Sequence, residues 1–273
     1  MKSMVLAWIA ACALLAQTPP LHDSGQSVTP AFEGWFPNSD GSFSILWGYY
    51  NRNLKQELDL PVGPENRMEP GGPDLGQPTH FLTRRQWGVF TVTVPKNFGS
   101  QKLIWTLTVN GQTNSVPAKL DPLWLLSPLV DATGNTPPFI GFDANGPFVQ
   151  GPEGQTKSLL AKVNQPLELP LWLADDASVI PGATRPRTPA VTVAWSKFRG
   201  PGVVTFASDR PAVEDAAFSA PPKTAFHGKA VTTATFSEPG EYVLRVVAND
   251  WSGDGGRGFQ CCWSNARVHV SVK

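Results

Sequence analysis

Six of the seven carboxylates in positions 33 to 74 are the side chains that we consider for acid and base chemistry. They are Glu33, Glu57, Asp59, Glu65, Glu69 and Asp74. Glycoside hydrolases use two carboxyl groups carried by separated strands, so they need no local sequence motif. Solvated strand and loop charges are the simpler interpretation of the same residues, and we adopt it. A glycan-active hydrolase that uses paired carboxylates in this part of the chain is the alternative.

Other catalytic constellations lack their motifs. The histidines are His22, His80, His227 and His269, and the sequence contains no GxSxG, HExxH or CxxC pattern. A serine hydrolase needs its nucleophile at a strained elbow, and a catalytic zinc needs converging His, Cys, Asp or Glu ligands. We therefore predict no catalytic residues and no enzymatic activity.

Aromatic residues crowd the segment from position 35 to position 50. Every second residue from Phe43 to Tyr49 is apolar or aromatic, so this face of a strand is predicted to point into a core. Trp35 and Tyr50 then remain as an exposed pair whose rings can stack on a sugar or on a partner side chain. Arginines add forked donors for a carboxylate or hydroxyl ligand. The candidate ligand-binding residues are Trp35, Tyr50, Arg52, Arg84 and Arg85.

A glycine-rich turn near position 250 concentrates oxygen ligands. Asn249, Asp250 and Asp254 make it a calcium candidate, although the spacing is not that of an EF-hand. We expect a plain hairpin turn in which Asp250 caps its own backbone, with no metal and no other cofactor. Calcium is the alternative.

Two cysteines are adjacent in the sequence. In an oxidising compartment Cys261 and Cys262 can close a small ring across one peptide bond, and we predict this vicinal disulfide. The alternatives are two free thiols on opposite faces of a strand, or a redox or metal role.

The first 16 residues predict a secretory signal peptide. The apolar run from Met4 to Ala16 is shorter than the roughly 20 residues that a membrane-spanning helix needs, and Ala16 precedes a cleavage site. Ile9 to Cys12 also resembles a lipobox, so lipid anchoring through Cys12 is a minor alternative. No later apolar run has spanning length, and we expect no transmembrane segment in the mature chain. The protein is predicted to be exported, to the periplasm or the extracellular space.

Composition and charge narrow the partners further. The chain has 273 residues, with 22 basic and 22 acidic side chains, 27 prolines and 25 glycines. The proline and glycine content falls short of a low-complexity chain. A net charge near zero without a basic cluster lacks the electrostatic footprint of nucleic-acid binders. We expect a folded chain that does not bind nucleic acid.

The elements that position all these residues are predicted to be β-strands. Leu103–Val109 alternates apolar and polar residues, and the same pattern recurs in 90–94, 191–195, 242–248 and 268–272. Asp40-Gly41 and Asn110-Gly111 are hairpin turn signals. Residues 60–77 are expected to form a long loop of functional interest.

Changes of composition along the chain divide it into segments. We predict a signal peptide (1–16), a flexible mature N-terminus (17–28), a first β-sandwich domain (29–126), a Pro/Gly-rich linker with a leading strand (127–157) and a second β-sandwich domain (158–273).

The second of these domains carries a family resemblance. The segment FSEPGEYVLRVVAND resembles the late-strand signature of immunoglobulin-like and PKD-type sandwiches, through Pro239, Gly240, Tyr242, Leu244, Val246 and Asp250. Trp195 looks like the core tryptophan of such domains. Because no cysteine occupies the usual inter-sheet positions, the resemblance implies an apolar core there, with Leu169 or Leu171 against Leu244. It covers roughly 138–273 and implies a fold but no activity.

The whole chain is also similar to uncharacterised exported proteins of environmental bacteria. The shared phrases are FEGW..NSDGSFS...GY.NRN, EPGGPD.GQPTHF and QCCWSNA. This resemblance implies no known chemistry. The sequence thus predicts an exported, all-β protein of two immunoglobulin-like β-sandwich domains, a non-catalytic binding or structural module that recognises a glycan or protein partner.

Overall fold

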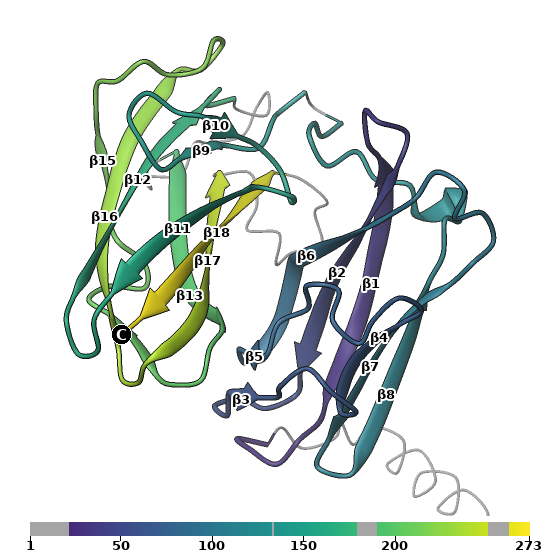
Figure 1. The fold of residues 1–273 in the computed structure, drawn as a ribbon. Coiled ribbons are helices and arrows are strands. Elements are labelled where there is room, and N and C mark those ends of the chain that lie inside the picture. The colour runs from purple at the N-terminus through teal and green to yellow at the C-terminus, as the bar shows by residue number, and fades with distance from the viewer. Residues whose placement is uncertain (1–21, 133, 179–189, 251–261) are drawn as a thin grey trace, which may run out of the picture.

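The computed structural model describes residues 22–132, 134–178, 190–250 and 262–273, and in these ranges the chain is all-β (Figure 1). The one helical element in these ranges is a single 3-10 turn, η1 (Pro122–Trp124). The described part of the chain has no helix of the length and apolar character that crossing a membrane requires. The all-β prediction is confirmed.

Eight strands make up what we call the N-terminal half. One sheet has the order β1-β2-β6, a second has the order β4-β7-β8, and β3 pairs with β5. The strands are β1 (Val28–Pro37), β2 (Phe43–Asn51), β3 (Leu58–Asp59), β4 (Asn66–Glu69), β5 (His80–Phe81), β6 (Arg84–Val94), β7 (Leu103–Val109) and β8 (Gln112–Ala118). The two larger sheets contribute to one hydrophobic cluster between them, an arrangement consistent with a β-sandwich.

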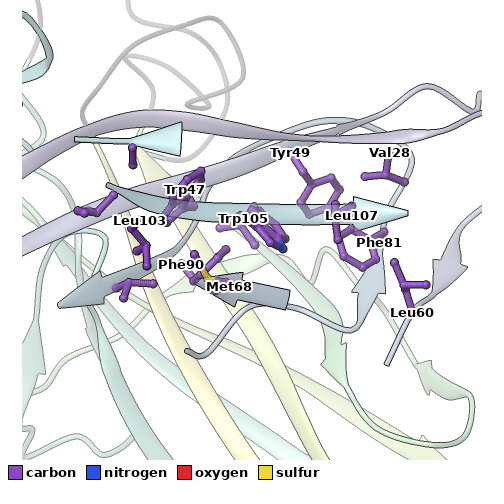
Figure 2. Packing of buried hydrophobic residues seen from close by; sticks show 14 of the residues in the cluster. Val28, Trp47, Tyr49, Leu60, Met68, Phe81, Phe90, Leu103, Trp105 and Leu107 are labelled. Atoms are coloured by element: carbon purple, nitrogen blue, oxygen red, sulfur yellow. The ribbon is translucent and has the colours of Figure 1, made fainter. Parts of the chain in front are cut away.

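Aromatic side chains fill the space between these two sheets (Figure 2). Ile45, Trp47 and Tyr49 are buried, as their shared parity predicts. Trp47 meets Trp105 edge-on, with ring centroids 5.9 Å apart. The indole N–H of Trp105 donates to Asn66 Oδ1 at 3.0 Å, so this buried polar group keeps a partner.

The predicted turn at Asp40-Gly41 joins β1 to β2. Gly41 has a φ of 84°, a conformation that glycine adopts without strain. The Asp40 carboxylate accepts hydrogen bonds from the backbone N–H and the hydroxyl of Ser42, which closes the turn.

Ten strands make up the C-terminal half. One sheet has the order β11-β18-β17-β13, and the other has the order β10-β9-β12-β16-β14 with β15 also on β16. The strands are β9 (Phe139–Gly141), β10 (Phe148–Val149), β11 (Gln155–Ala161), β12 (Leu167–Asp175), β13 (Val191–Arg199), β14 (Val204–Phe206), β15 (Val213–Asp215), β16 (Phe226–Phe236), β17 (Gly240–Asp250) and β18 (Trp263–Val272). Among the paired strands in the described ranges, only β11 and β18 run parallel.

The second core lies between these two sheets. Leu169, Leu171 and Leu244 are buried together in one cluster with Trp195, as the sequence pattern predicts. The opposite face of β17 carries Val243, Arg245 and Val247, which lie toward the N-terminal half. Strand alternation therefore separates a core face from a face that contacts the other half.

Two segments expected to be irregular contain strands. The loop predicted at 60–77 includes β4, which pairs with β7. Side chains of Asn66 and Gln77 hold the rest of it by bonds to backbone carbonyls, including Asn66 Nδ2 to Pro78 O at 2.8 Å. The stretch 127–157, predicted as linker and leading strand, contains β9, β10 and the start of β11, and β9 pairs with β12.

The two halves lie side by side, with β13, β17 and β18 toward β5 and β6 (Figure 1). Phe198 of β13 is buried in the cluster of the N-terminal half, and its carbonyl accepts from Thr79 N at 3.1 Å. A further cluster joins Phe36 and Leu46 of one half to Trp263 of the other. We call this contact region the junction.

Candidate functional site

A pocket of about 580 Å³ opens at the junction and is lined by both halves. We call it the junction pocket. The N-terminal half supplies Glu57, Asp59, His80, Leu82, Thr83 and Gln86, and the C-terminal half supplies Ala194, Trp195, Ser196, Lys197, Val203, Val204, Phe206, Asp209, Arg210, Arg245 and Val247. Interfaces between domains are a common location for ligand pockets.

The acidic rim of the pocket follows from the short β3–β5 pairing. Asp59 lies directly opposite His80 in the register of these strands. Glu57 is two residues before Asp59 and therefore shares its face, while Leu58 between them packs toward the core. His80 thus meets both carboxylates: its Nδ1 lies 3.0 Å from Asp59 Oδ1, and its Nε2 lies 3.0 Å from Glu57 Oε2.

Lys197 completes this cluster from the other half. Its Nζ lies 2.9 Å from Asp59 Oδ1 and donates to Gly202 O at 3.0 Å. The Lys197 side chain is only 8% exposed, whereas that of Asp59 is 56% exposed. The ammonium group is therefore fixed beneath a carboxylate that still faces solvent.

The hydrogen bonds of this cluster depend on charge. An ionised carboxylate only accepts, so His80 makes both of its carboxylate bonds at once when both ring nitrogens carry hydrogen. The hydrogen bond from His80 is the main reason that the pKa of Glu57 lies below its usual range; burial opposes this effect. Glu57 is nevertheless 50% exposed, so its ionised oxygens remain accessible from the pocket.

The inner wall of the pocket is Arg245 of β17. Its Nε donates to Asn265 Oδ1 at 3.0 Å, and its Nη2 donates to the carbonyls of Trp87 and Gly88 at 3.3 and 3.0 Å. Asn265 also donates to Gly88 O at 2.8 Å. The guanidinium is therefore held rigidly between the halves.

Glu33 is the buried acid of the junction. It accepts from Arg85 Nη2 at 2.6 Å and from Gly88 N at 2.7 Å. Burial raises the pKa of Glu33, and the neighbouring Arg85 counteracts part of that rise. Glu33 does not line the junction pocket, and both of its oxygens are engaged.

Most of the sequence-predicted ligand residues lie near one another, but Trp35 does not: Tyr50 pairs with Arg85 in the β2–β6 register and lies under Arg52. Trp35 is half-buried: its indole N–H donates to Asp121 O at 2.8 Å, and its ring meets Phe43 edge-on. It pairs with Ile45 in the β1–β2 register, whereas Tyr50 pairs with Thr29 at the other end of β1. Trp35 and Tyr50 therefore do not form a common aromatic platform.

The three predicted arginines differ in their surroundings. Arg52 is exposed and lies over the Tyr50 ring, with its guanidinium carbon 5.5 Å from the ring centroid. Arg84 is also exposed, whereas Arg85 stacks over Trp87 at 3.7 Å and pairs with Glu33. Arg85 is thus engaged by Glu33, and a ligand role for all five predicted residues stays a prediction.

The calcium and cysteine predictions fall partly outside the described residues. Asp254 and Cys261 lie there, as do residues 1–16 with Cys12. Asp250 accepts from Asn135 Nδ2 at 2.5 Å, and no three His, Cys, Asp or Glu side chains of the described ranges lie together as metal ligands. Cys262 is buried and disulfide-bonded. The calcium site and the vicinal ring both stay predictions.

Comparison with known proteins gives only distant structural likeness. No protein-family model and no curated protein matches the chain. The chain is similar to domains 4 and 5 of the S-layer protein SbsC, with 10% identity over 90% of this chain and 98% of that one, at a TM-score of 0.23.

Two further solved structures are similarly distant. One is the endo-fucoidan hydrolase MfFcnA9 from glycoside hydrolase family 107, with 9% identity over 90% of this chain and 35% of that one, at a TM-score of 0.23. The other is CfaE, the adhesive subunit of CFA/I fimbria of enterotoxigenic Escherichia coli, with 9% identity over 94% and 82% of the two chains, at a TM-score of 0.25. Scores this low carry no argument about function.

Sequence reasoning missed the role of His80, Lys197 and Arg245. The pattern Glu57-Leu58-Asp59 does signal two carboxylates on one face of a strand. Nothing local in the sequence shows that His80 pairs opposite them, or that Lys197 reaches them from more than 100 residues away.

Proposed function

We propose that the protein is an exported, non-catalytic binding module, located at the cell surface or in the periplasm, that holds a glycan in the junction pocket. The observation that carries this proposal is the pair Glu57 and Asp59. Both carboxylates are about half exposed at the pocket, and both are fixed from behind by His80.

Fixed, accessible carboxylates suit hydroxyl-rich ligands. Each ionised oxygen accepts from a sugar hydroxyl, and such charge-assisted bonds are stronger than neutral ones. Because His80 and Lys197 already hold the carboxylates, binding orders few side chains and loses little conformational entropy. Val204 and Phe206 add apolar surface to the pocket lining, against which the carbon face of a sugar ring can pack.

The electrostatics favour binding over hydrolysis. A glycosidase needs one carboxyl group whose pKa is raised, so that it can donate a proton to the leaving group. The pKa of Glu57 is instead lowered by its bond from His80. Glu33 has the raised pKa, but its oxygens are engaged by Arg85 and Gly88 away from the pocket. These observations support the binding module over the glycan-active hydrolase.

Strand order supports an immunoglobulin-like or PKD-type C-terminal half. The order β9-β12-β16-β14 corresponds to the A-B-E-D sheet of that fold, and β13-β17-β18 corresponds to C-F-G. Tyr242 lies near the start of β17, and its hydroxyl donates to Glu238 O at 2.9 Å, as in a tyrosine corner. On this basis we propose two sandwich domains, the second immunoglobulin-like. The signal peptide, and lipid anchoring through Cys12 as its minor alternative, belong to the same proposal.

A glycan and cell-wall binding screen tests the function. The screen is run with and without calcium. We expect the mature wild-type protein to bind a defined set of glycans under both conditions. Glu57→Gln should weaken binding about tenfold or more, since one charge-assisted bond becomes a neutral one. Glu168→Gln, an exposed residue of β12 outside the pocket, is the matched control and should bind like wild type.

Three outcomes would contradict the proposal. Equal binding by Glu57→Gln and by Asp59→Asn would move the site away from the junction pocket. Absence of any glycan or cell-wall binding by the wild type would favour a structural module or a protein partner. Glycan cleavage that is lost in both variants would establish the hydrolase.

A further inference from the structure

Arg245 is a buried charge whose partners are all neutral. It is 6% exposed, and its recorded acceptors are the Asn265 side-chain oxygen and the carbonyls of Trp87 and Gly88. Its Nη1 makes no hydrogen bond to another described residue. Arg245 is also one of the residues that line the junction pocket.

Most acids of the junction are held by other basic side chains, and the exception is Asp209, which lines the pocket and makes no ion pair in the described ranges. Across the described ranges, the ion pairs at the junction are Arg85–Glu33, Lys197–Asp59, Arg199–Asp74 and those of His80 with Glu57 and Asp59. None of them includes Arg245. Arg267, a partly buried arginine of the same region, has no ion pair there either and lies over the Phe198 ring.

The junction therefore carries more positive than negative charge in its interior. Burying an unpaired charge is costly, because the charge loses its hydration without gaining a counter-charge. This burial lowers the pKa of Arg245 to about 10, and the nearby Arg267 contributes to the same effect, while Tyr49 and the Glu33 carboxylate partly oppose it. Glu33 is hydrogen-bonded to Arg85 and Gly88, so Arg245 makes no direct ion pair in the described ranges, and a ligand in the pocket can supply one.

We propose that the glycan bound in the junction pocket carries an oxyanion, as a carboxylate, sulfate ester or phosphate ester, and that this group pairs with Arg245. The inference rests on the proposed function and adds the chemical class of the ligand. A guanidinium presents parallel N–H donors that match the oxygens of such groups.

The other charges that face the pocket are compatible with this ligand. Glu57 and Asp59 are held by contacts with His80 and Lys197, and they lie on β3 and the residue before it, whereas Arg245 lies on β17. Asp209 and Arg210 follow β14 and bring one charge of each sign to the wall. The acids therefore remain available for hydroxyls while Arg245 takes the anionic group.

Calorimetric titration of the full mature protein with four probes tests this inference. The probes are glucose, glucuronate, glucose 6-sulfate and inorganic sulfate. We expect the two charged sugars to bind about tenfold or more tightly than glucose, because they alone add a charge-assisted bond to Arg245. Inorganic sulfate should compete weakly with glucuronate, and added sodium chloride should weaken both charged sugars more than glucose.

Substitutions of Arg245 test whether this residue causes the preference for charged sugars over glucose. Arg245→Met should abolish the preference for charged sugars while glucose binding persists, and Arg245→Lys should retain part of it. Lys102→Met, an exposed cation outside the pocket, is the control and should bind like wild type. If Arg245→Met does not fold, the wild-type ranking of the probes still decides, since it needs no variant.

The outcomes separate this inference from the proposed function. Equal affinity of wild type for glucose and glucuronate, or an unchanged preference in Arg245→Met, would overturn the oxyanion assignment and leave glycan binding intact. Binding of inorganic sulfate by wild type but not by Arg245→Met, without binding of any sugar, would support the anion site and refute the glycan function.

Discussion

Arg199 and Asp74, 125 residues apart in the chain, form a two-pronged ion pair across the junction. Nη1 and Nη2 of Arg199 donate to the two carboxylate oxygens of Asp74 at 2.9 and 2.8 Å, and Nε donates to Gln77 O at 2.8 Å. Paired, parallel bonds of this kind fix direction as well as distance. The segment that contains β4 is thereby fastened to β13 of the other half.

Breaking this ion pair should loosen the junction by a modest amount. Asp74 is about half exposed, so Asp74→Ala should cost about 0.5–1 kcal/mol of unfolding free energy. Arg199→Ala also removes the bonds to Gln77 O and should cost about 1–2 kcal/mol. Urea unfolding of both single variants and the double variant measures the coupling. The exposed pair Lys55–Asp23 is the control, since Lys55→Ala should change stability by less than about 0.5 kcal/mol.

Acid should remove the stabilisation that Asp74 provides. Its hydrogen bonds from Arg199 hold its pKa below the ordinary value of 3.8, so the folded state binds this proton less readily than the unfolded chain. The stabilisation is therefore present above pH 3.8 and is lost as the pH falls through the folded-state pKa. Unfolding of wild type and Asp74→Asn at a series of pH values should show their difference narrowing below pH 3.8. A constant difference would refute this account.

Gly88 should not tolerate a side chain. It has a φ of 52°, and a Cβ added there would run into the indole ring of Trp263. Gly88→Ala combines backbone strain with overpacking and should cost about 2 kcal/mol or more. Gly41→Ala is the matched control, because Gly41 has a φ of 84° but no atom near its missing Cβ. It should lose only about 1 kcal/mol in thermal or urea unfolding.

Tyr242→Phe should destabilise the C-terminal half. The phenol hydroxyl accepts from Gly202 N at 3.1 Å and donates to Glu238 O, and all of it is buried. Removing it leaves a buried N–H without a partner, which costs about 1–3 kcal/mol. Tyr50→Phe, in which the ring contact with Arg52 is kept, should change stability by less than about 0.5 kcal/mol. Equal effects of the two substitutions would show that the hydrogen bonds of the Tyr242 hydroxyl contribute nothing to the free energy of unfolding.

Intact mass should report both export and the cysteine state. We expect the secreted protein to begin at Gln17 and to take up no alkylating group until a reductant is added, because Cys262 is disulfide-bonded. Two groups added without reductant would eliminate the vicinal ring with Cys261. A mass that includes a lipid on Cys12 would establish the anchor instead.

Local patterns predicted much of the scaffold. The alternation in Leu103–Val109 marks β7 with the bounds that the structure has, and the parity of Ile45, Trp47 and Tyr49 identifies the face of β2 that joins the core of the N-terminal half. These predictions succeed because each rests on the period of a strand. The opposite face of β2 is also buried, through Ser44 and Leu46, and the pattern did not indicate this. β4 was missed because Asn66–Glu69 offers only Met68 as an apolar residue, and its pairing with β7 depends on tertiary contacts.

The candidate site depends on such tertiary contacts throughout. Arg245 alternates with buried Leu244 and Val246, which predicts a solvent-facing side chain, yet the N-terminal half covers it. Arg85 was expected to bind a ligand through its forked donors, and it forms an ion pair with Glu33. The local sequence around a charged residue on the outer face of a strand does not show that the other half of the protein packs over it.

Phe198 makes the two halves depend on each other, so we expect them to be inherited together. Its ring belongs to the C-terminal half by sequence but sits in the hydrophobic cluster of the N-terminal half. Recombination that separates the two halves would leave a cavity in the N-terminal half and an exposed phenylalanine ring on the C-terminal half. The two halves should therefore be inherited, and expressed from plasmids, together.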